Sequence, residues 1–323
     1  MKAAVLTDTG LQIQDVPEPR PEASQVLVRV KACGLNRADL IMASGRKHGS
    51  HGGAGTIAGL EWSGEVVEVG AEVEGFKAGD RVMCSGGGGY AEYALSDVGR
   101  TVPIPANNMT FEQAATLPIA LQTMHDAVVT NGRLIKGEVV VIQGASSGVG
   151  LMAMQIAKLM GARMVIGTST NEGRRARLAE FGADLALDSS DPNWPDAVLE
   201  ATDGEGADLI VDQISAGVAN QNMKAVRVRG RIVNVGRLGG FNGDFDFDLH
   251  ALKRIDYIGV TFRTRSVEEV REIVRRMRAD LWDAVESGLL HLPIDRTFSL
   301  DEAAVAQAHM GANAHFGKIV LRV

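Results

Sequence analysis

The sequence of 323 residues predicts an α/β fold, in which a doubly wound, six-stranded parallel sheet is joined to a partly open, barrel-like β domain. Three observations predict it. An apolar run, Val139–Ile142, leads into a turn of small residues and then into a helical pattern. Strand-like and helical runs continue to alternate as far as Thr261. Residues 1–120, in contrast, contain short alternating strands broken by glycine clusters.

The turn after Val139–Ile142 predicts an anion-binding site. Small residues let backbone N–H groups approach phosphates closely, and the N-terminal end of the helix beginning near Gly148 adds partial positive charge, so we expect a dinucleotide pyrophosphate there. The usual G-x-G-x-x-G pattern keeps glycine only at its third place, Gly150, and an ordinary tight strand-to-helix turn is the alternative. The residues expected to face the phosphates are Ser146, Ser147, Gly148 and Val149.

The middle of the chain continues with strand and helix signals in alternation. The expected helices include Gly150–Met160 and Arg174–Phe181. Six strands that alternate with helices imply a doubly wound parallel sheet. After Val139–Ile142, the expected strands are Arg163–Gly167, Leu185–Asp188, Asp208–Asp212, Arg231–Val235 and Tyr257–Thr261.

Both ends of the chain are expected to form the β domain. Gly52–Gly55 and Gly86–Gly89 separate short strands, which are expected at Gln25–Lys31, Gly64–Val69 and Asp80–Met83. A charged helix over Val267–Leu281 and a strand over Gly317–Leu321 end the chain, and this last strand is expected to return to the first domain. The expected domains are residues 1–120 with 266–323, and residues 121–265.

Composition agrees with two joined domains that have ample core. The chain is 45% hydrophobic with a formal net charge of -7, which does not favour a nucleic-acid surface. The short apolar run Ala3–Leu6 is broken by Asp8, and no apolar stretch is long enough to cross a bilayer, so we expect a cytoplasmic protein without membrane contact. Cys33 and Cys84 are too few for a disulfide framework and are expected to be buried.

Several motifs, spread in a fixed order, carry a resemblance to a known family. They are Gly34-Leu35-Asn36-Arg37-Ala38-Asp39, Gly59-Leu60-Glu61-x-x-Gly64, Gly79-Asp80-Arg81-Val82, Tyr90-Ala91-Glu92-Tyr93, Ala114-Ala115-x-x-Pro118 with Thr123, Ser147-Gly148-Val149-Gly150, Gly230-Arg231-x-x-x-x-Gly236 and Asn313-x-x-x-Gly317-Lys318-Ile319-Val320-Leu321. Over essentially all its residues, the chain resembles the quinone oxidoreductase (zeta-crystallin-like) branch of the medium-chain dehydrogenase/reductase superfamily. The resemblance implies a GroES-like catalytic domain formed by both chain ends and interrupted by a Rossmann domain.

Zinc alcohol dehydrogenases of the same superfamily are an alternative that the residues disfavour. Asn36 and Leu60 stand where their metal ligands would fall, and neither an amide nor an isobutyl group can replace a thiolate or an imidazole. His48-x-x-His51 has metal-like spacing but lies in a glycine-rich loop with no third ligand evident. We therefore expect no zinc.

Without a metal, the resemblance implies hydride transfer from NADPH to a quinone, or else to another activated alkene. In the family, the asparagine that matches Asn36 lies beside the nicotinamide, so its amide would donate to the acceptor carbonyl, and Asp39 would orient its neighbours. The alternative for this pair is a helix N-cap with a supporting acidic residue. Relatives usually place a tyrosine soon after the helix that Asn36 would cap, whereas this chain has Ser44–His48 there and no tyrosine. Within this stretch, Arg46 would bind acidic or enoyl-thioester acceptors, or else it would lie in a solvated basic loop.

Cofactor choice follows from the end of the second strand of the sheet. NAD-preferring proteins usually carry a carboxylate there, whereas this chain has Thr168, Ser169, Thr170 and Asn171, with Arg174 or Arg175 next to bind a 2′-phosphate. NADPH is therefore favoured, and NADH is the alternative. Gly173 and Ser189 replace a lysine and a tyrosine common in relatives, and Glu172 is close enough to repel a phosphate.

The resemblance alone implies the remaining cofactor contacts. These are Thr123 near the nicotinamide ribose, the Val235-Gly236 turn, Phe262-Arg263 after the sixth strand, and Asn313 near the pyrophosphate. Each has an ordinary alternative: Thr123 as a helix cap, Gly236 as a strand end, Phe262 as core and Asn313 as part of a loop before Gly317.

The sixth strand, Tyr257–Thr261, is expected at the sheet edge. An unpaired apolar edge invites aggregation, so we expect it to pair with its copy in a homodimer, as in the family. Some zeta-crystallin relatives are abundant lens proteins or bind RNA, which leaves a non-enzymatic role as an alternative. The acidic charge balance gives RNA binding no support.

Overall fold

The computed structural model describes residues 1–323. The chain divides into two compact units. Unit 1 consists of Met1–Gln122 and Phe262–Val323, and unit 2 is Thr123–Thr261. In this division residues 121–122 and 262–265, which were expected in the second domain, belong to unit 1.

Unit 2 is built on a six-stranded parallel sheet. Its order is β10-β9-β8-β11-β12-β13, the doubly wound arrangement that the alternating strand and helix signals predict. Strand β13 lies at the edge, as expected for the sixth strand. The strands are β8 (Val139–Ile142), β9 (Met164–Thr168), β10 (Leu185–Leu187), β11 (Ala207–Asp212), β12 (Val226–Asn234) and β13 (Asp256–Gly259).

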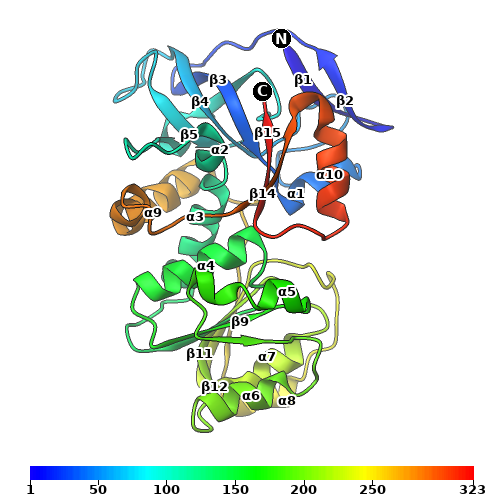
Figure 1. Ribbon diagram of the computed structural model, residues 1–323, viewed down its shortest axis with the longest axis vertical. Coiled ribbons are helices and arrows are strands. Elements are labelled where there is room, and N and C mark those ends of the chain that lie inside the picture. Colours follow the sequence, from blue (N-terminus) through cyan, green and yellow to red (C-terminus); the bar gives the residue numbers. More distant parts are fainter. The chain divides into compact units, whose positions relative to one another are not determined.

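Helices cover both faces of this sheet. In Figure 1, α4 and α5 lie on the opposite side of the strands from α6, α7 and α8. Strands β8 and β11 are buried along their whole length because helices cover both faces, which explains the apolar runs Val139–Ile142 and Leu209–Val211. The helices of this unit are the π-helix η2 (Asp126–Asn131), α4 (Gly148–Leu159), α5 (Glu172–Arg175), the 3₁₀ helix η3 (Leu178–Phe181), α6 (Trp194–Ala201), α7 (Ala219–Ala225) and α8 (Phe247–Lys253). Helix α3 (Pro118–His125) is divided between the units, with residues 118–122 in unit 1 and residues 123–125 in unit 2.

Two predicted elements of unit 2 differ in the structure. The helix expected over Arg174–Phe181 is two short pieces, since α5 ends at Arg175 and η3 begins at Leu178. Strand β12 begins at Val226, five residues before the expected Arg231. Its first part contains a register shift against β11 and a left-handed residue, Arg229 (φ 61°), so it lacks the regular alternation of a paired strand.

Unit 1 contains a seven-stranded sheet and a separate β1-β2 hairpin. The sheet order is β14-β15-β3-β4-β5-β7, and β6 also pairs with β3. Strand β15 runs antiparallel to β3, with Val320 opposite Gly34, which confirms that the end of the chain returns to the first domain. The strands are β1 (Lys2–Thr7), β2 (Gly10–Asp15), β3 (Gln25–Gly34), β4 (Glu61–Val69), β5 (Arg81–Ser85), β6 (Tyr93–Asp97), β7 (Thr101–Pro103), β14 (Ile294–Ser299) and β15 (Lys318–Arg322).

The longest helix of unit 1, α9, is amphipathic. Its buried residues include Val270, Ile273, Val274 and Met277, whose spacing places them on one face. It begins at Val267 as expected but ends at Glu286 rather than Leu281. The helices of this unit are α1 (Arg37–Ala43), the 3₁₀ helix η1 (Val98–Arg100), α2 (Phe111–Ala114), α9 (Val267–Glu286), the 3₁₀ helix η4 (Leu300–Glu302) and α10 (Ala303–Gly311).

Cys33 and Cys84 are fully buried in unit 1, as expected. Burial raises the pKa of the Cys84 thiol to about 12 and that of Cys33 well above its ordinary value. Both therefore serve as small apolar core residues. None of the helices combines the length and the apolar composition that a membrane span requires.

Candidate cofactor-binding and active sites

The turn after β8 leaves backbone donors for an anion. Ser147 is the N-cap of α4, and its hydroxyl oxygen accepts from the Gly150 N–H at 3.1 Å. The first N–H groups of a helix, here those of Gly148 and Val149, have no acceptor within the helix. A Cβ at Gly150 would lie 2.6 Å from the Gly144 carbonyl oxygen, so only glycine permits this close approach of helix and turn.

A buried polar network supports this turn from below. Thr168 Oγ1 donates to Gln143 Oε1 at 2.7 Å and accepts from the Gly144 N–H at 3.2 Å. Gln143 Nε2 donates to Asn222 Oδ1 at 2.9 Å, and Asn222 Nδ2 donates to Asp212 Oδ2 at 3.0 Å. Thr168 is fully buried and its hydroxyl is committed to this network, so it supports the turn rather than facing a 2′-phosphate.

Gln213 adds an amide donor beside the turn. Its Oε1 lies 2.9 Å from Ser147 Oγ, and its Nε2 is buried with no hydrogen-bond partner among the protein groups. Leaving a buried donor unsatisfied is costly, and a phosphate group would supply the missing acceptor. The turn and Gln213 together fit the pyrophosphate of a dinucleotide. Sequence reasoning missed Gln213 because it lies outside the motif.

The residues after β9 are suited to a 2′-phosphate. Ser169 Oγ lies 3.1 Å from Ser146 Oγ, so the second strand end adjoins the turn. The exposed Asn171 caps α5, accepting from the Arg174 N–H at 2.9 Å. Arg175, the alternative to Arg174, donates to the Ser169 carbonyl oxygen at 2.9 Å and to Asp188 at 3.0 Å. Arg175 therefore fixes the strand end, and Arg174 is the better candidate for the phosphate.

Four further predicted positions lie in unit 2. Val235 and Gly236 directly follow β12, and a Cβ at Gly236 would lie 2.5 Å from the Gln213 carbonyl oxygen, so the turn packs closely on the end of β11. Thr123 lies inside α3 and does not cap it, which rules out that alternative. Thr170 is exposed after β9.

Asn36 is the centre of a buried polar cluster in unit 1. It is the N-cap of α1, as the cap alternative predicted, but its side chain turns toward a buried ion pair. Asn36 Nδ2 donates to Glu61 Oε1 at 2.8 Å, and Asn36 Oδ1 accepts from Lys318 Nζ at 3.0 Å. Lys318 and Glu61 form a salt bridge, with side-chain exposures of only 5% and 0%. A Cβ at Gly34 would lie 2.6 Å from Glu61 Oε1, so this glycine makes room for the carboxylate.

Asp39 fixes the backbone of Asn36. Its Oδ2 accepts from the Asn36 N–H at 2.7 Å and from the Tyr90 hydroxyl at 2.9 Å, whereas Oδ1 is buried without a partner. Burial raises the pKa of Asp39 to about 7, although these two hydrogen bonds act against it. Burial, with the nearby Asp39 carboxyl, also raises the pKa of Tyr90 well above its ordinary value.

Arg46 and the two histidines lie in the loop after α1. Arg46 is exposed, and its backbone N–H donates to the Ile41 carbonyl oxygen at 3.3 Å. His48 and His51 face each other through a backbone bridge. Burial lowers the pKa of His51, with Arg100 adding to the effect. Leu60, at the other position of a zinc ligand in relatives, is buried in the core of unit 1.

Phe262, Arg263 and Asn313 belong to unit 1, and their contact with a cofactor stays a prediction. Phe262 is half-buried with the Arg265 guanidinium over its ring, so it is not core in the ordinary sense. Arg263 is exposed. Asn313 has a left-handed backbone (φ 55°), and its Oδ1 accepts from Arg37 at 2.6 Å, which anchors the loop before Gly317.

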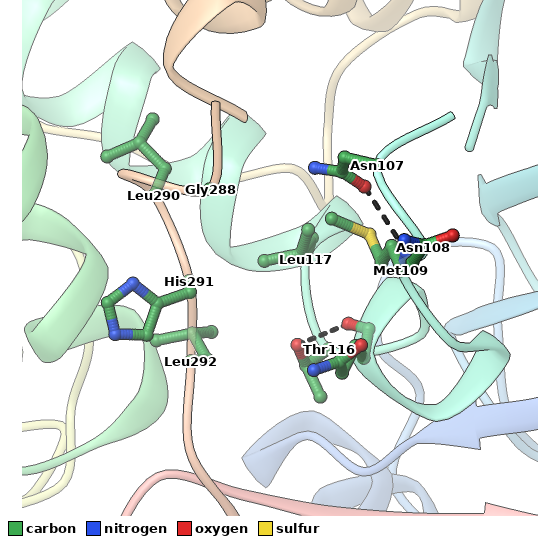
Figure 2. A pocket seen from close by; sticks show the side chains of 10 residues that line it. Asn107, Asn108, Met109, Thr116, Leu117, Gly288, Leu290, His291 and Leu292 are labelled. Carbon is green, nitrogen blue, oxygen red and sulfur yellow. Dashed lines mark hydrogen bonds between the residues drawn. The ribbon is translucent and has the colours of Figure 1, made fainter. Parts of the chain in front are cut away.

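Unit 1 also has a pocket of about 430 Å³ that contains none of the predicted site residues (Figure 2). Its polar side chains are engaged locally: Asn107 donates to the Glu286 carbonyl oxygen at 2.8 Å and accepts from the Met109 N–H at 3.3 Å, and Thr116 donates to the Gln113 carbonyl oxygen at 2.7 Å. These contacts tie the end of α9 to the segment after β7. The pocket is lined by Asn107, Asn108, Met109, Gln113, Thr116, Leu117, Gly288, Leu290, His291 and Leu292.

The fold and these sites define a protein with a dinucleotide-binding sheet and a β unit formed by both chain ends. Two family models match these parts. Residues 22–106 match the alcohol dehydrogenase GroES-like domain, and residues 148–279 match the zinc-binding dehydrogenases. The second matched region contains neither Asn36 nor Leu60.

Known proteins are similar over nearly the whole chain. A quinone oxidoreductase of Rattus norvegicus is 31% identical over 312 residues, which cover 95% of this chain and 92% of that protein. A component of the phenolphthiocerol/phthiocerol polyketide synthase of Mycobacterium tuberculosis is 31% identical over 314 residues, covering 97% of this chain but only 14% of that much longer protein. A mycobacterial protein solved with NADPH has a TM-score of 0.88 at 25% identity, with 100% of each chain covered.

The chain belongs to the quinone oxidoreductase-like branch of the medium-chain dehydrogenase/reductase superfamily. This confirms the resemblance drawn from the motifs. It also confirms the GroES-like and Rossmann architecture. The relatives and structural neighbours include quinone oxidoreductases and an alcohol dehydrogenase, which are oxidoreductases.

Proposed function

We propose that the protein is an NADPH-dependent quinone oxidoreductase that works by direct hydride transfer without a metal. The observation that carries the proposal is the Asn36 amide, which is held by Glu61 and Lys318 at a position where zinc relatives bind their metal. Support also comes from the anion-binding turn of unit 2 and from the rat quinone oxidoreductase, which is similar over almost its whole length.

The residues of the chain would bind and orient the reactants. The N–H groups of Gly148 and Val149 would bind the pyrophosphate, with Gln213 as an additional donor. When bound, NADPH supplies a hydride. Asn36 would donate to the carbonyl oxygen of the acceptor, where negative charge develops as the hydride arrives. A preorganised donor of this kind stabilises the transition state more than the ground state.

NADPH, rather than NADH, is proposed from the residues after β9. Ser169, Thr170 and Asn171 offer short polar groups, and Arg174 would bind the 2′-phosphate. The neighbour solved with NADPH supports the cofactor class. The proposed absence of zinc follows from the chemistry of Asn36 and Leu60, which are poor zinc ligands.

Reduction of α,β-unsaturated carbonyl compounds, such as enoyl thioesters, is the second candidate. It is favoured by the similarity of almost the whole chain to part of a polyketide synthase. The exposed Arg46 is a suitable donor for an acidic acceptor. Both candidates use the same donor, because each acceptor has a carbonyl oxygen that gains negative charge.

The test is oxidation of NADPH by the purified protein with a panel of acceptors. Turnover with ortho- or para-quinones supports the first candidate, and turnover with enals or enoyl thioesters supports the second. Tight NADPH binding with no turnover on any acceptor would contradict both and favour a non-enzymatic role. The variant Gly148→Val is expected to lose NADPH binding while remaining folded, because a side chain there blocks the phosphates.

We also propose a cytoplasmic homodimer that forms through the edge strand β13, as well as a small-molecule partner and no nucleic-acid or membrane partner. Strand β13 leaves one side of its backbone unpaired in the sheet. Sedimentation at micromolar concentration would show a dimer if this is right, and a monomer would refute it.

A further inference from the structure

We propose that the buried Glu61–Lys318 ion pair is a positioning device that fixes the orientation of the Asn36 amide, so that Asn36 offers a ligand only a hydrogen-bond donor. This rests on the proposed function and deepens it. It assigns Glu61 and Lys318 as positioning residues and restricts the acceptor to compounds whose reacting end presents an oxygen lone pair.

Lys318 holds the Asn36 oxygen as a hydrogen-bond acceptor. An ammonium group has three donors and no acceptor. All three are used, by the Leu35 carbonyl oxygen at 2.8 Å, by Asn36 Oδ1 at 3.0 Å and by Glu61 Oε1. The side chain of Lys318 comes from β15 and is 5% exposed, so it has no room to turn to other partners.

Glu61 fixes the nitrogen of the same amide. A carboxylate only accepts hydrogen bonds. Glu61 Oε1 accepts from Asn36 Nδ2 at 2.8 Å, and Oε2 accepts from the Ile119 N–H at 2.9 Å. The Ile119 bond prevents the carboxylate from swinging away, so a donor must stay on the side of Asn36 that faces Glu61.

A flipped Asn36 amide would be strongly unfavourable. It would place the amide oxygen against a carboxylate and the amide nitrogen against an ammonium group, with both charges buried. The backbone of Asn36 is also held, because its N–H donates to Asp39 Oδ2 at 2.7 Å. The second hydrogen on Nδ2 has no acceptor among residues 1–323, and it is the donor that the half-buried amide has left for a ligand. The Asn36 oxygen is occupied by Lys318 and by the capping box that Asn36 forms with Asp39 at the start of α1.

The consequence is a site specific for hydrogen-bond acceptors. A carbonyl oxygen that gains negative charge during reduction binds the N–H more strongly as the reaction proceeds. A ligand whose reacting end carries only donors, such as an ammonium group, meets another donor, and a neutral hydroxyl accepts from the N–H more weakly than an oxygen that gains negative charge. The ion pair thus favours reduction of carbonyl-conjugated acceptors.

The experiment compares four variants for turnover and for NADPH affinity measured by cofactor fluorescence. Asn36→Ala removes the donor itself. Lys318→Met leaves Glu61 as an unpaired buried charge, which destabilises unit 1. The double variant Glu61→Gln/Lys318→Met is therefore made as well, because it removes both charges of the pair. In the double variant, the Ile119 N–H holds the oxygen of the new glutamine, whose nitrogen then faces Asn36 and favours the flipped amide.

Arg231→Met is the matched control. It breaks another buried ion pair, Arg231–Glu138, whose side chains are 10% and 11% exposed. This pair lies at the amino end of the unit 2 sheet, away from the turn that is expected to bind the phosphates. Its thermal stability is expected to fall while kcat stays at the wild-type value.

We expect Asn36→Ala and the double variant to lower kcat by about 100-fold or more, the lower end of what removing one such donor costs, with the dissociation constant of NADPH unchanged. If Asn36→Ala lowers kcat but the folded double variant matches the wild type, the positioning role is refuted and the proposed function stands. If Asn36→Ala has no effect, the donor role of Asn36 itself fails. A wild-type protein without turnover on any acceptor refutes the proposed function.

Discussion

Replacing Asp39 with asparagine tests the protonation of the buried carboxyl beside Asn36. Burial raises the pKa of Asp39 to about 7 in the folded protein, against about 3.9 for an unfolded aspartate. Between these values the folded state holds a proton that the unfolded state has lost. Folding stability therefore decreases as pH rises through this window, and the contribution of the proton is fully present only below the unfolded pKa.

The size of the effect follows from linkage. Each unit of pH within the window costs about 1.4 kcal/mol, so between pH 5 and pH 8 the wild type is expected to lose about 2.5 kcal/mol through Asp39 alone. The amide introduced by Asp39→Asn would still accept from the Asn36 N–H and the Tyr90 hydroxyl but would not titrate. The variant is thus expected to gain about 2.5 kcal/mol relative to the wild type over this range.

The assay is urea unfolding of both proteins at pH 5 and pH 8, followed by tryptophan fluorescence. Subtracting the two proteins cancels all other titrating groups. Asp283→Asn, at an exposed position on α9 of the same unit, is the control for replacing an aspartate by an asparagine. If the Asp39→Asn and wild-type stabilities change in parallel from pH 5 to pH 8, the reasoning about the buried carboxyl is wrong.

Four further outcomes are expected. Gly150→Ala should weaken NADPH binding and lower the melting temperature, because its Cβ would lie 2.6 Å from the Gly144 carbonyl oxygen. A wild-type NADPH dissociation constant and melting temperature, both measured by calorimetry, would contradict the close packing. Arg174→Ala should raise the KM for NADPH much more than that for NADH in steady-state kinetics, and equal effects would defeat the 2′-phosphate assignment. Arg46→Ala should reduce turnover of acidic enoyl substrates more than that of neutral quinones; no change with either class would end the case for Arg46. Asn107→Ala should cost about 1 kcal/mol of stability on chemical unfolding, because it removes the side-chain hydrogen bonds to the last carbonyls of α9, and wild-type stability would show that these bonds contribute nothing.

Local patterns in the sequence predicted the parallel sheet well. Val139–Ile142 is a strand with the expected bounds, because apolar runs buried on both faces give an unbroken signal. Strand β12 was predicted too short because its first residues are largely exposed and include arginines. No glycine or proline marks the break between α5 and η3 in the sequence, so the pattern gave no signal for it; Leu178 and Phe181 of η3 are buried.

The cofactor turn and Asn36 were predicted from the sequence, whereas the side chains that hold the Asn36 amide, Glu61 and Lys318, were not. Glu61 and Lys318 were seen only as parts of motifs, and they are separated by 257 positions in the chain. A pairing over such a distance depends on the register of β4 and β15, which no local pattern encodes. One signal was present: each is a charged residue that directly borders an apolar strand, where an unpaired charge would be costly.

The place of β15 in the sheet has a consequence for synthesis. Because residues 318–322 pair with β3, the nascent N-terminal segment cannot close its sheet or neutralise Glu61 until those residues have been translated. The Rossmann unit, made of consecutive residues, can meanwhile fold on the ribosome. The strands of residues 1–122 must wait with open edges during that interval, which is when we expect this chain to depend most on chaperones.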